Sequence, residues 1–225
     1  NWGFDQYLSQ APIAFILTVM EKEANGHQMH MRGFYAGRDA TAFEQAARLS
    51  QQVNLNLLDR PMKKAVVYID PHEFRSTWLG NKAVYRTRMA IADAGELLVL
   101  APGLKEFGED KEIHRLIRKY GYYGTPHTLR MVKENPELGD NLSAAAHLIH
   151  GASEGRFRIR YCPGPGMSLD EIRAVGYEAG DLEAMLRHYD PDKLNDGWNT
   201  LPDGEEIFFI SNPGLGLWAL REKFV

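Results

Sequence analysis

Three basic residues recur along the segment that follows a strongly apolar stretch of the chain. They are Arg75, Lys82 and Arg86. On a helix that turns about 100° per residue, these side chains lie within roughly 40° of one another. A neighbouring apolar stripe would pack on a sheet: Phe74, Trp78, Tyr85 and Met89. Cations beside a core suit the carboxylate or phosphate of a ligand, although a solvated basic face with ordinary helix packing explains the same pattern.

The turn at Asp70-Pro71-His72-Glu73 leads into this basic segment and follows a buried apolar run. Ligands of open α/β sheets bind beyond the carboxyl ends of the strands. We therefore expect His72 and Arg75 at the rim of a binding site. Asp70 and Glu73 would serve equally well as simple helix caps.

A second candidate is the histidine pair His147 and His150 in the segment 141–150. Two histidines one helical turn apart can bind a metal or pass protons, and here they would line the same cleft as Lys82. No third ligand has a defined position, so we predict no metal site, and a purely structural role for both histidines stays open. The buried stripe of this helix is expected to be Leu142, Ala146 and Ile149.

Bulk composition narrows the class of protein. The chain has 225 residues, 44% of them hydrophobic, and a formal net charge of -4, which gives no sign of general nucleic-acid binding. No apolar run is long enough to span a bilayer, so we expect no membrane partner. The single Cys162 excludes an internal disulfide and zinc sites built from several cysteines, and a reducing cytoplasmic location fits best.

Hydrophobic patterning predicts an α/β fold. The nearly continuous apolar runs 64–70 and 96–101 flank the basic segment and form a βαβ unit, which requires a parallel sheet. Strands 13–21 and 27–35, joined by a turn at Asn25-Gly26, predict an N-terminal hairpin, and Asp39 would cap the helix that follows. Ser168 and Glu171 form a capping box. Further strands are expected at 156–161 and 206–210, and helices at 111–120, 128–134, 141–150 and 181–189. We expect one domain over residues 1–225, with a mostly parallel sheet flanked by helices and a small hairpin layer.

Three stretches carry a resemblance to a known family. They are Trp78-Leu-Gly-Asn-Lys-Ala83, Gly95-Glu-Leu-Leu-Val-Leu-Ala-Pro-Gly103, and the ending from Glu205 to Trp218. In order and local pattern they resemble the C-terminal half of the lactate racemase family, from about residue 13 onward. That family comprises nickel-pincer-nucleotide-dependent racemases and epimerases of 2-hydroxy acids.

The resemblance implies a two-domain enzyme of which this chain is the C-terminal, substrate-side domain. A separate N-terminal domain would bind the nickel-pincer nucleotide, so this half alone is expected to be inactive. Lys82 followed by Ala83 matches the family's substrate-contacting lysine and is the catalytic candidate. Arg75 and Arg86 would help to bind the carboxylate of a 2-hydroxy acid.

Two departures from the family pattern affect the expected substrate. Leu79 stands where the family has glutamine, and Asp70-Pro71-His72-Glu73 replaces a Gly-Tyr-Pro turn. Both point away from lactate itself. The polar residues around Lys82 favour a larger, hydroxyl-rich acid such as an aldonate, and hence a sugar-acid C2 epimerase.

Two other classes of function stay open from the sequence. One is a non-catalytic acid-binding or assembly domain, which would bind a carboxylate without needing a cofactor. The other is a nicotinamide-dependent oxidoreductase, against which the missing G-x-G-x-x-G fingerprint argues.

Overall fold

The computed structural model describes residues 6–8, 11–22 and 28–223, and the chain divides into two compact units, 1–56 and 57–225. We describe each unit by itself. The predicted turn at Asn25-Gly26 lies outside the described residues. A single domain over residues 1–225 stays a prediction.

The first unit is a hairpin with one helix. Strands β1 (Phe15–Lys22) and β2 (Met29–Gly37) pair in antiparallel fashion, which confirms the small N-terminal hairpin, and α2 (Ala40–Asn54) packs against both. Asp39 caps α2 as predicted, because its side chain accepts a hydrogen bond of 2.9 Å from the Thr41 amide. A Cβ atom at Gly33 would come within 2.6 Å of Leu49, so the glycine lets the helix approach the hairpin closely. Strand β3 (Leu55–Leu58) follows α2 and crosses the boundary between the units.

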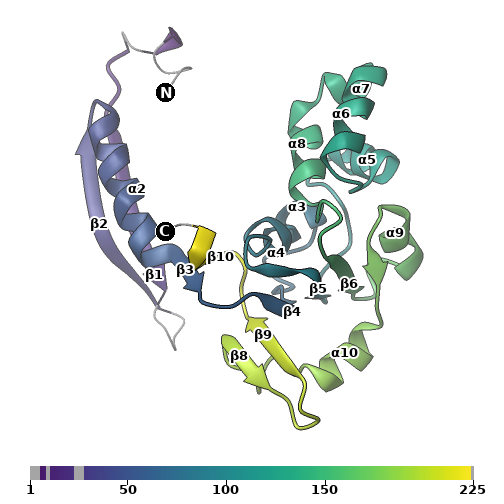
Figure 1. The fold of residues 1–225 in the computed structure, drawn as a ribbon. Coiled ribbons are helices and arrows are strands. Elements are labelled where there is room, and N and C mark those ends of the chain that lie inside the picture. Colours follow the sequence, from purple (N-terminus) through teal and green to yellow (C-terminus); the bar gives the residue numbers. More distant parts are fainter. Residues whose placement is uncertain (1–5, 9–10, 23–27, 224–225) are drawn as a thin grey trace. The chain divides into compact units, whose positions relative to one another are not determined.

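The second unit is built on a six-stranded sheet of order β7-β6-β5-β4-β9-β8 (Figure 1). Strands β4 to β7 and β9 run parallel to their neighbours, and only β8 is antiparallel, to β9. This confirms the α/β class and the predicted parallel pairing of the two apolar runs. The six strands are β4 (Met62–Tyr68), β5 (Ile91–Ala101), β6 (Arg158–Pro163), β7 (Glu178–Ala179), β8 (Gly197–Thr200) and β9 (Glu206–Ile210).

Alternate residues of the central strands enter two separate cores. Val67 and Val99 belong to the larger core, which holds the buried side chains of the helices from α3 to α9. Val66 and Leu98 belong to the smaller core, which is covered by α10 and the segment after it. Both faces of the sheet are therefore buried, as the continuous apolar runs required. Helices α5 to α8 also pack on one another at one end of the larger core.

The helices of this unit are mostly short. They are α3 (Thr77–Gly80), α4 (Lys82–Tyr85), α5 (Lys111–Tyr120), α6 (Thr125–Glu134), α7 (Pro136–Gly139), α8 (Leu142–His150), α9 (Leu169–Ala174) and α10 (Leu182–His188). The capping box of Ser168 and Glu171 is present at the start of α9, as predicted. Strand β10 (Leu217–Leu220) and the 3-10 turn η1 (Arg221–Lys223) end the described chain.

The prediction of a continuous basic helix after β4 was wrong. Arg75 lies in the irregular segment before α3, and its carbonyl accepts hydrogen bonds from the amides of Lys105 and Glu106. The helical part is broken at Asn81 into two single turns, α3 and α4. Arg75 and Lys82 therefore do not share a helical face.

The cysteine of the sequence is buried in the smaller core. Cys162 is fully buried at the end of β6, and a Cβ atom on Gly180 would come within 2.7 Å of its sulfur. Burial raises the pKa of the Cys162 thiol to about 12, so the thiol stays protonated and unreactive. In the part of the chain that the structure describes, no helix is long and apolar enough to cross a membrane.

Candidate functional site

The carboxyl ends of β4 and β9 meet at the point where the strand order reverses. From β4 the chain builds β5, β6 and β7 to one side, whereas β9 pairs with the other side of β4. The loops after these two strands touch, because the Asn212 side-chain amide donates a hydrogen bond of 3.2 Å to Glu73. A topological switch point of this kind is the usual place for a ligand in an open α/β sheet.

Lys82 lies next to these loops. It begins α4, is half-buried, and holds its ammonium 5.7 Å from the centre of the Phe74 ring. Phe74 in turn borders the loop after β9, since a Cβ atom on Gly214 would lie 3.6 Å from its ring. Within the described residues, no carboxylate forms an ion pair with Lys82. Binding of an external anion by this ammonium group stays a prediction.

Arg86 fastens the loop after β9 to α4. Its Nη1 atom donates hydrogen bonds to the carbonyl oxygens of Gly214, at 2.6 Å, and Gly216, at 3.2 Å. The Arg86 carbonyl also accepts a hydrogen bond of 2.8 Å from the Trp218 amide. Arg86 thus contacts this loop directly, whereas Lys82 is linked to it through Phe74, and the Arg86 guanidinium already has two backbone partners. A direct contact between Arg86 and a substrate stays a prediction.

Arg75 and His72 lie on the exposed approach to this edge of the sheet. His72 is exposed in the turn after β4, where its amide donates a hydrogen bond of 2.7 Å to Asp70. Arg75 is exposed as well, and the structure shows no ion pair for it within the described residues. Both positions fit the predicted rim, and their binding roles stay predictions.

The two histidines of α8 lie in different surroundings. His147 is buried, and its Nε2 atom lies 3.0 Å from the Tyr122 hydroxyl and 3.4 Å from the Asn81 amide nitrogen. His150 is exposed, with its ring 5.8 Å from that of Tyr85. The predicted buried stripe of α8 was wrong, because Leu142 is 66% exposed whereas His147 faces the core.

His147 belongs to a buried polar network that holds Asn81, the residue before Lys82. The Asn81 carbonyl oxygen accepts hydrogen bonds from Tyr161, at 2.7 Å, and Tyr177, at 3.1 Å. Burial, with a smaller effect from the charge of His150, lowers the pKa of His147 to about 4. The ring is therefore neutral near pH 7, and its described contacts fix the start of α4.

The nickel centre implied by the family resemblance needs a set of metal ligands. Among the described residues, no group of three or more histidine, cysteine, aspartate or glutamate side chains is placed to hold a metal ion. The described part of this chain therefore does not fit as the ligand set of that centre. We derive no chemical step through the cofactor.

Comparison with known proteins supports the fold. No family model and no curated protein matches the chain. A crystal structure of a Thermotoga maritima protein, solved by structural genomics, is similar with a TM-score of 0.71 and 22% sequence identity, over 92% of this chain and 49% of that one. The lactate racemase apoprotein from Thermoanaerobacterium thermosaccharolyticum is similar with a TM-score of 0.58 and 10% identity, over 90% of this chain and 45% of that one.

The chain shares its fold with part of a lactate racemase. At these levels of identity the likeness concerns the fold alone, and the chain spans about half the length of the structures that it matches. These two similarities support the lactate racemase-like α/β fold that the sequence predicts.

Sequence reasoning missed the contribution of the loop after β9. Asn212 and Gly214 follow the apolar run 206–210, so their place at a carboxyl end was readable. Their proximity to Phe74 and Lys82 could not be predicted from the sequence, because β9 pairs with β4 across more than a hundred intervening residues. Only the tertiary fold brings these loops together.

Proposed function

We infer that this chain is the substrate-side domain of an isomerase that racemises or epimerises a 2-hydroxy acid, and that Lys82 binds the substrate carboxylate. The observation that carries the proposal is Lys82, a half-buried residue beside Phe74 at the switch point, whose ammonium has no carboxylate partner among the described residues. The lactate racemase-like fold supports the class of substrate. We expect a sugar acid such as an aldonate rather than lactate.

The physical role of Lys82 follows from its surroundings. The Lys82 ammonium lies 5.7 Å from the centre of the Phe74 ring, and the ring occupies space that water would fill around a fully exposed lysine. A charge-assisted hydrogen bond to a carboxylate is stronger there, and it would orient the C2 carbon of the acid. Arg86 would act by holding the Gly214–Gly216 loop in place, and His147 by holding Asn81.

A complete enzyme needs a second domain under this proposal. The chain spans about half of the structures that it matches, and we expect a separate N-terminal domain to bind the nickel-pincer nucleotide. The isolated chain would then bind the acid but not turn it over.

Ligand binding is the first test. We expect a 2-hydroxy acid or aldonate to raise the melting temperature of the chain, because a ligand that binds only the folded state stabilises it by mass action. The Lys82→Ala variant should bind the same acid roughly 10- to 100-fold more weakly, through the loss of a charge-assisted hydrogen bond. Isothermal titration of both proteins measures this ratio.

The matched control is Lys63→Ala. Lys63 is exposed near the amino end of β4, at the opposite end of the strand, and its removal changes the net charge equally. Equal weakening by both variants would indicate general charge attraction and contradict the role of Lys82.

For the activity, the chain combined with a cofactor-loaded N-terminal domain should exchange the C2 hydrogen of the acid. Absence of exchange with every 2-hydroxy acid tested would reject the isomerase.

A further inference from the structure

A second concave site lies on the opposite face of the sheet from Lys82. Its cavity has a volume of about 580 Å³ and is bordered by Tyr68, the last residue of β4, and Pro102, which follows β5. Helix α10 and the residues after it close the other side. The cavity thus sits at the carboxyl ends of two parallel strands, and its volume is that of a small-molecule site.

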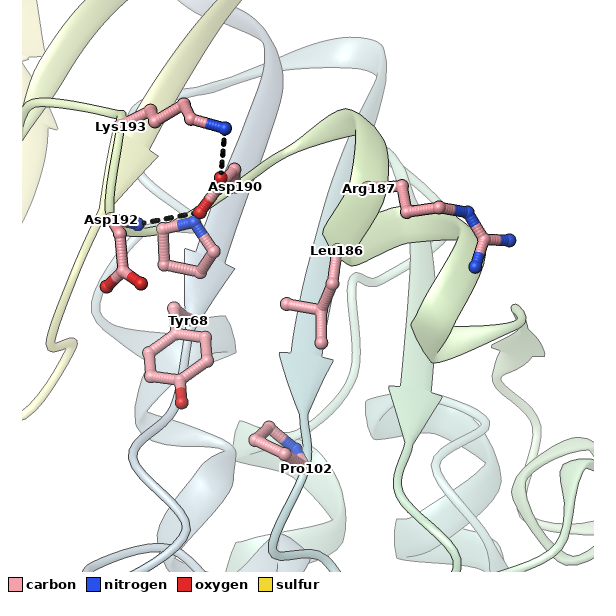
Figure 2. A pocket seen from close by; sticks show the side chains of 8 residues that line it. Tyr68, Pro102, Leu186, Arg187, Asp190, Asp192 and Lys193 are labelled. Carbon is pink, nitrogen blue, oxygen red and sulfur yellow. Dashed lines mark hydrogen bonds and ion pairs between the residues drawn. The ribbon is translucent and has the colours of Figure 1, made fainter.

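The walls of this cavity combine apolar and charged residues. The Tyr68 ring, Leu186 and Pro102 surround the open space in Figure 2, and Pro191 adds a further apolar surface. Polar groups come from the segment that crosses the cavity after α10, residues 190–193. An occupant would therefore have an apolar body and one polar end.

The charges of the lining leave one carboxylate free. Lys193 is held by Asp190 in an ion pair of 2.7 Å. Arg187 also lines the cavity, but its side chain is 72% exposed, its guanidinium lies on the side away from Tyr68 and Asp192 in Figure 2, and Glu183 is 3.9 Å from it. The Asp192 amide donates a hydrogen bond to Asp190, but within the described residues its own carboxylate has no hydrogen-bond or ion-pair partner. Asp192 is thus the lining carboxylate without an ion pair among the described residues, and its charge acts on Lys193, whose pKa is raised by Asp190 and to a smaller extent by Asp192.

Tyr68 adds a second feature that favours a cation. The face of an aromatic ring attracts an ammonium group. Burial raises the pKa of Tyr68, and the negative charges of Asp70 and Asp192 raise it further. Both carboxylates are therefore close enough to the Tyr68 hydroxyl to disfavour a further negative charge beside it.

We propose that this cavity binds a small organic ammonium ion, whose apolar body packs between Tyr68, Leu186 and Pro102 and whose charged nitrogen pairs with Asp192. The site is independent of Lys82, which lies on the other face, and it takes the opposite charge from a 2-hydroxy acid. It would make the chain a receptor for two ligands of different chemistry.

Calorimetric titration with benzylammonium chloride tests the site. We expect saturable binding of benzylammonium, at least tenfold weaker binding of the neutral benzyl alcohol, and no binding of benzoate. The Asp192→Asn variant should bind benzylammonium roughly tenfold more weakly, since it loses a charge-assisted contact. Tyr68→Leu, which keeps apolar bulk but removes the ring, should also weaken binding severalfold.

Two variants serve as controls. Asp140→Asn removes an exposed carboxylate at the end of α7 and should leave the affinity unchanged. Lys82→Ala should also leave it unchanged, so failure of this site is separable from failure of the proposed function. The proposal is overturned if benzylammonium shows no saturable binding, if benzoate binds as tightly, or if Asp192→Asn binds as the unaltered chain does.

Discussion

At the scale of single residues, the decisive feature is how deeply each candidate side chain is buried. Lys82 is half-buried and has no carboxylate partner among the described residues. His147 is 7% exposed and contacts Tyr122 and Asn81. Lys82 therefore keeps a charge that a ligand can pair with, whereas the neutral His147 ring holds Asn81, the residue before Lys82, in place.

The burial of His147 predicts a pH dependence of stability. Its pKa of about 4 lies below the ordinary value of 6.5, so between these values the folded state binds fewer protons than the unfolded state. The stabilisation is complete above about pH 6.5 and is lost as the pH falls towards 4. At pH 4.5 the loss amounts to about 2–3 kcal/mol.

Urea unfolding of the chain and of His147→Gln at pH 7 and pH 4.5 measures this effect. The variant keeps a side chain that can hydrogen-bond but does not titrate, so its stability should fall less over this range, by about 2–3 kcal/mol. Equal pH dependence in both proteins would mean that His147 is accessible to protons in the folded state.

The two histidines of α8 could not be told apart from the sequence alone. His147 and His150 are of the same type and lie one turn apart, and the helix that carries them was correctly predicted. Which face of α8 is buried depends on Tyr122 and Trp78, whose positions are set by the fold. Lys82 could be selected only through the family resemblance, because composition and spacing do not show which lysine lacks a partner.

At the scale of elements, a row of alternating charges crosses four neighbouring strands of the sheet, β7, β6, β5 and β4. Arg160 pairs with Glu178 at 2.8 Å and with the buried Glu96 at 3.3 Å. Lys64 pairs with Glu96 at 3.5 Å and with Glu205 at 2.8 Å. Burial lowers the pKa of Lys64, but its contacts with Glu205 and Tyr189 outweigh this effect and raise the pKa.

Removing the middle of this row should destabilise the sheet. We expect Glu96→Ala to lower the free energy of unfolding by about 1–3 kcal/mol, because two cations that are largely withdrawn from water lose a shared partner. Chemical denaturation measures the change. Glu112→Ala, which breaks an exposed pair with Arg115, is the control and should leave the stability almost unchanged. Similar losses in both variants would mean that the buried row is no stronger than a surface pair.

Elements with strong local signals were predicted well. The apolar runs, the Asp39 cap and the Ser168 capping box each carry their own structural signal and are present in the structure. The basic helix was mispredicted because its periodicity is helical although its backbone is not. Asn81 interrupts it, and the hydrogen bonds that Asn81 makes with Tyr161 and Tyr177 come from distant strands and loops.

At the scale of the whole molecule, the two hydrophobic cores belong to residues 57–225. Every buried residue of both cores lies in this unit. The main elements among the described residues of the first unit are a two-stranded hairpin and the helix α2, and the buried apolar residues among them are Val19, Ala42 and Ala46. A lone hairpin of this size is at best marginally stable in water.

This distribution predicts that a fragment of residues 57–225 folds without the first unit. We expect cooperative thermal unfolding and a far-ultraviolet circular dichroism spectrum of mixed α/β type. A fragment of residues 1–56 should lack a cooperative transition under the same conditions. Noncooperative unfolding of the longer fragment would show that the sheet depends on the hairpin unit.

The parallel sheet was predictable as a class but not in its full order. A strand, a helical segment and a second strand in close succession require a parallel pair, and β4 and β5 form one. The return of β9 to the far side of β4 depends on contacts across the whole unit. The switch point, and with it the setting of Lys82, therefore emerges only when the chain is folded.

Because its cysteine is buried, this protein is convenient for site-specific labelling at an introduced cysteine. Cys162 is the single cysteine of the sequence, and its thiol is buried and protonated. A cysteine introduced at an exposed position, such as Lys193 at the mouth of the cavity, would be the one thiol that reacts readily with a maleimide dye. A fluorescent label that reports ligand entry can therefore be attached at the introduced cysteine without first replacing Cys162.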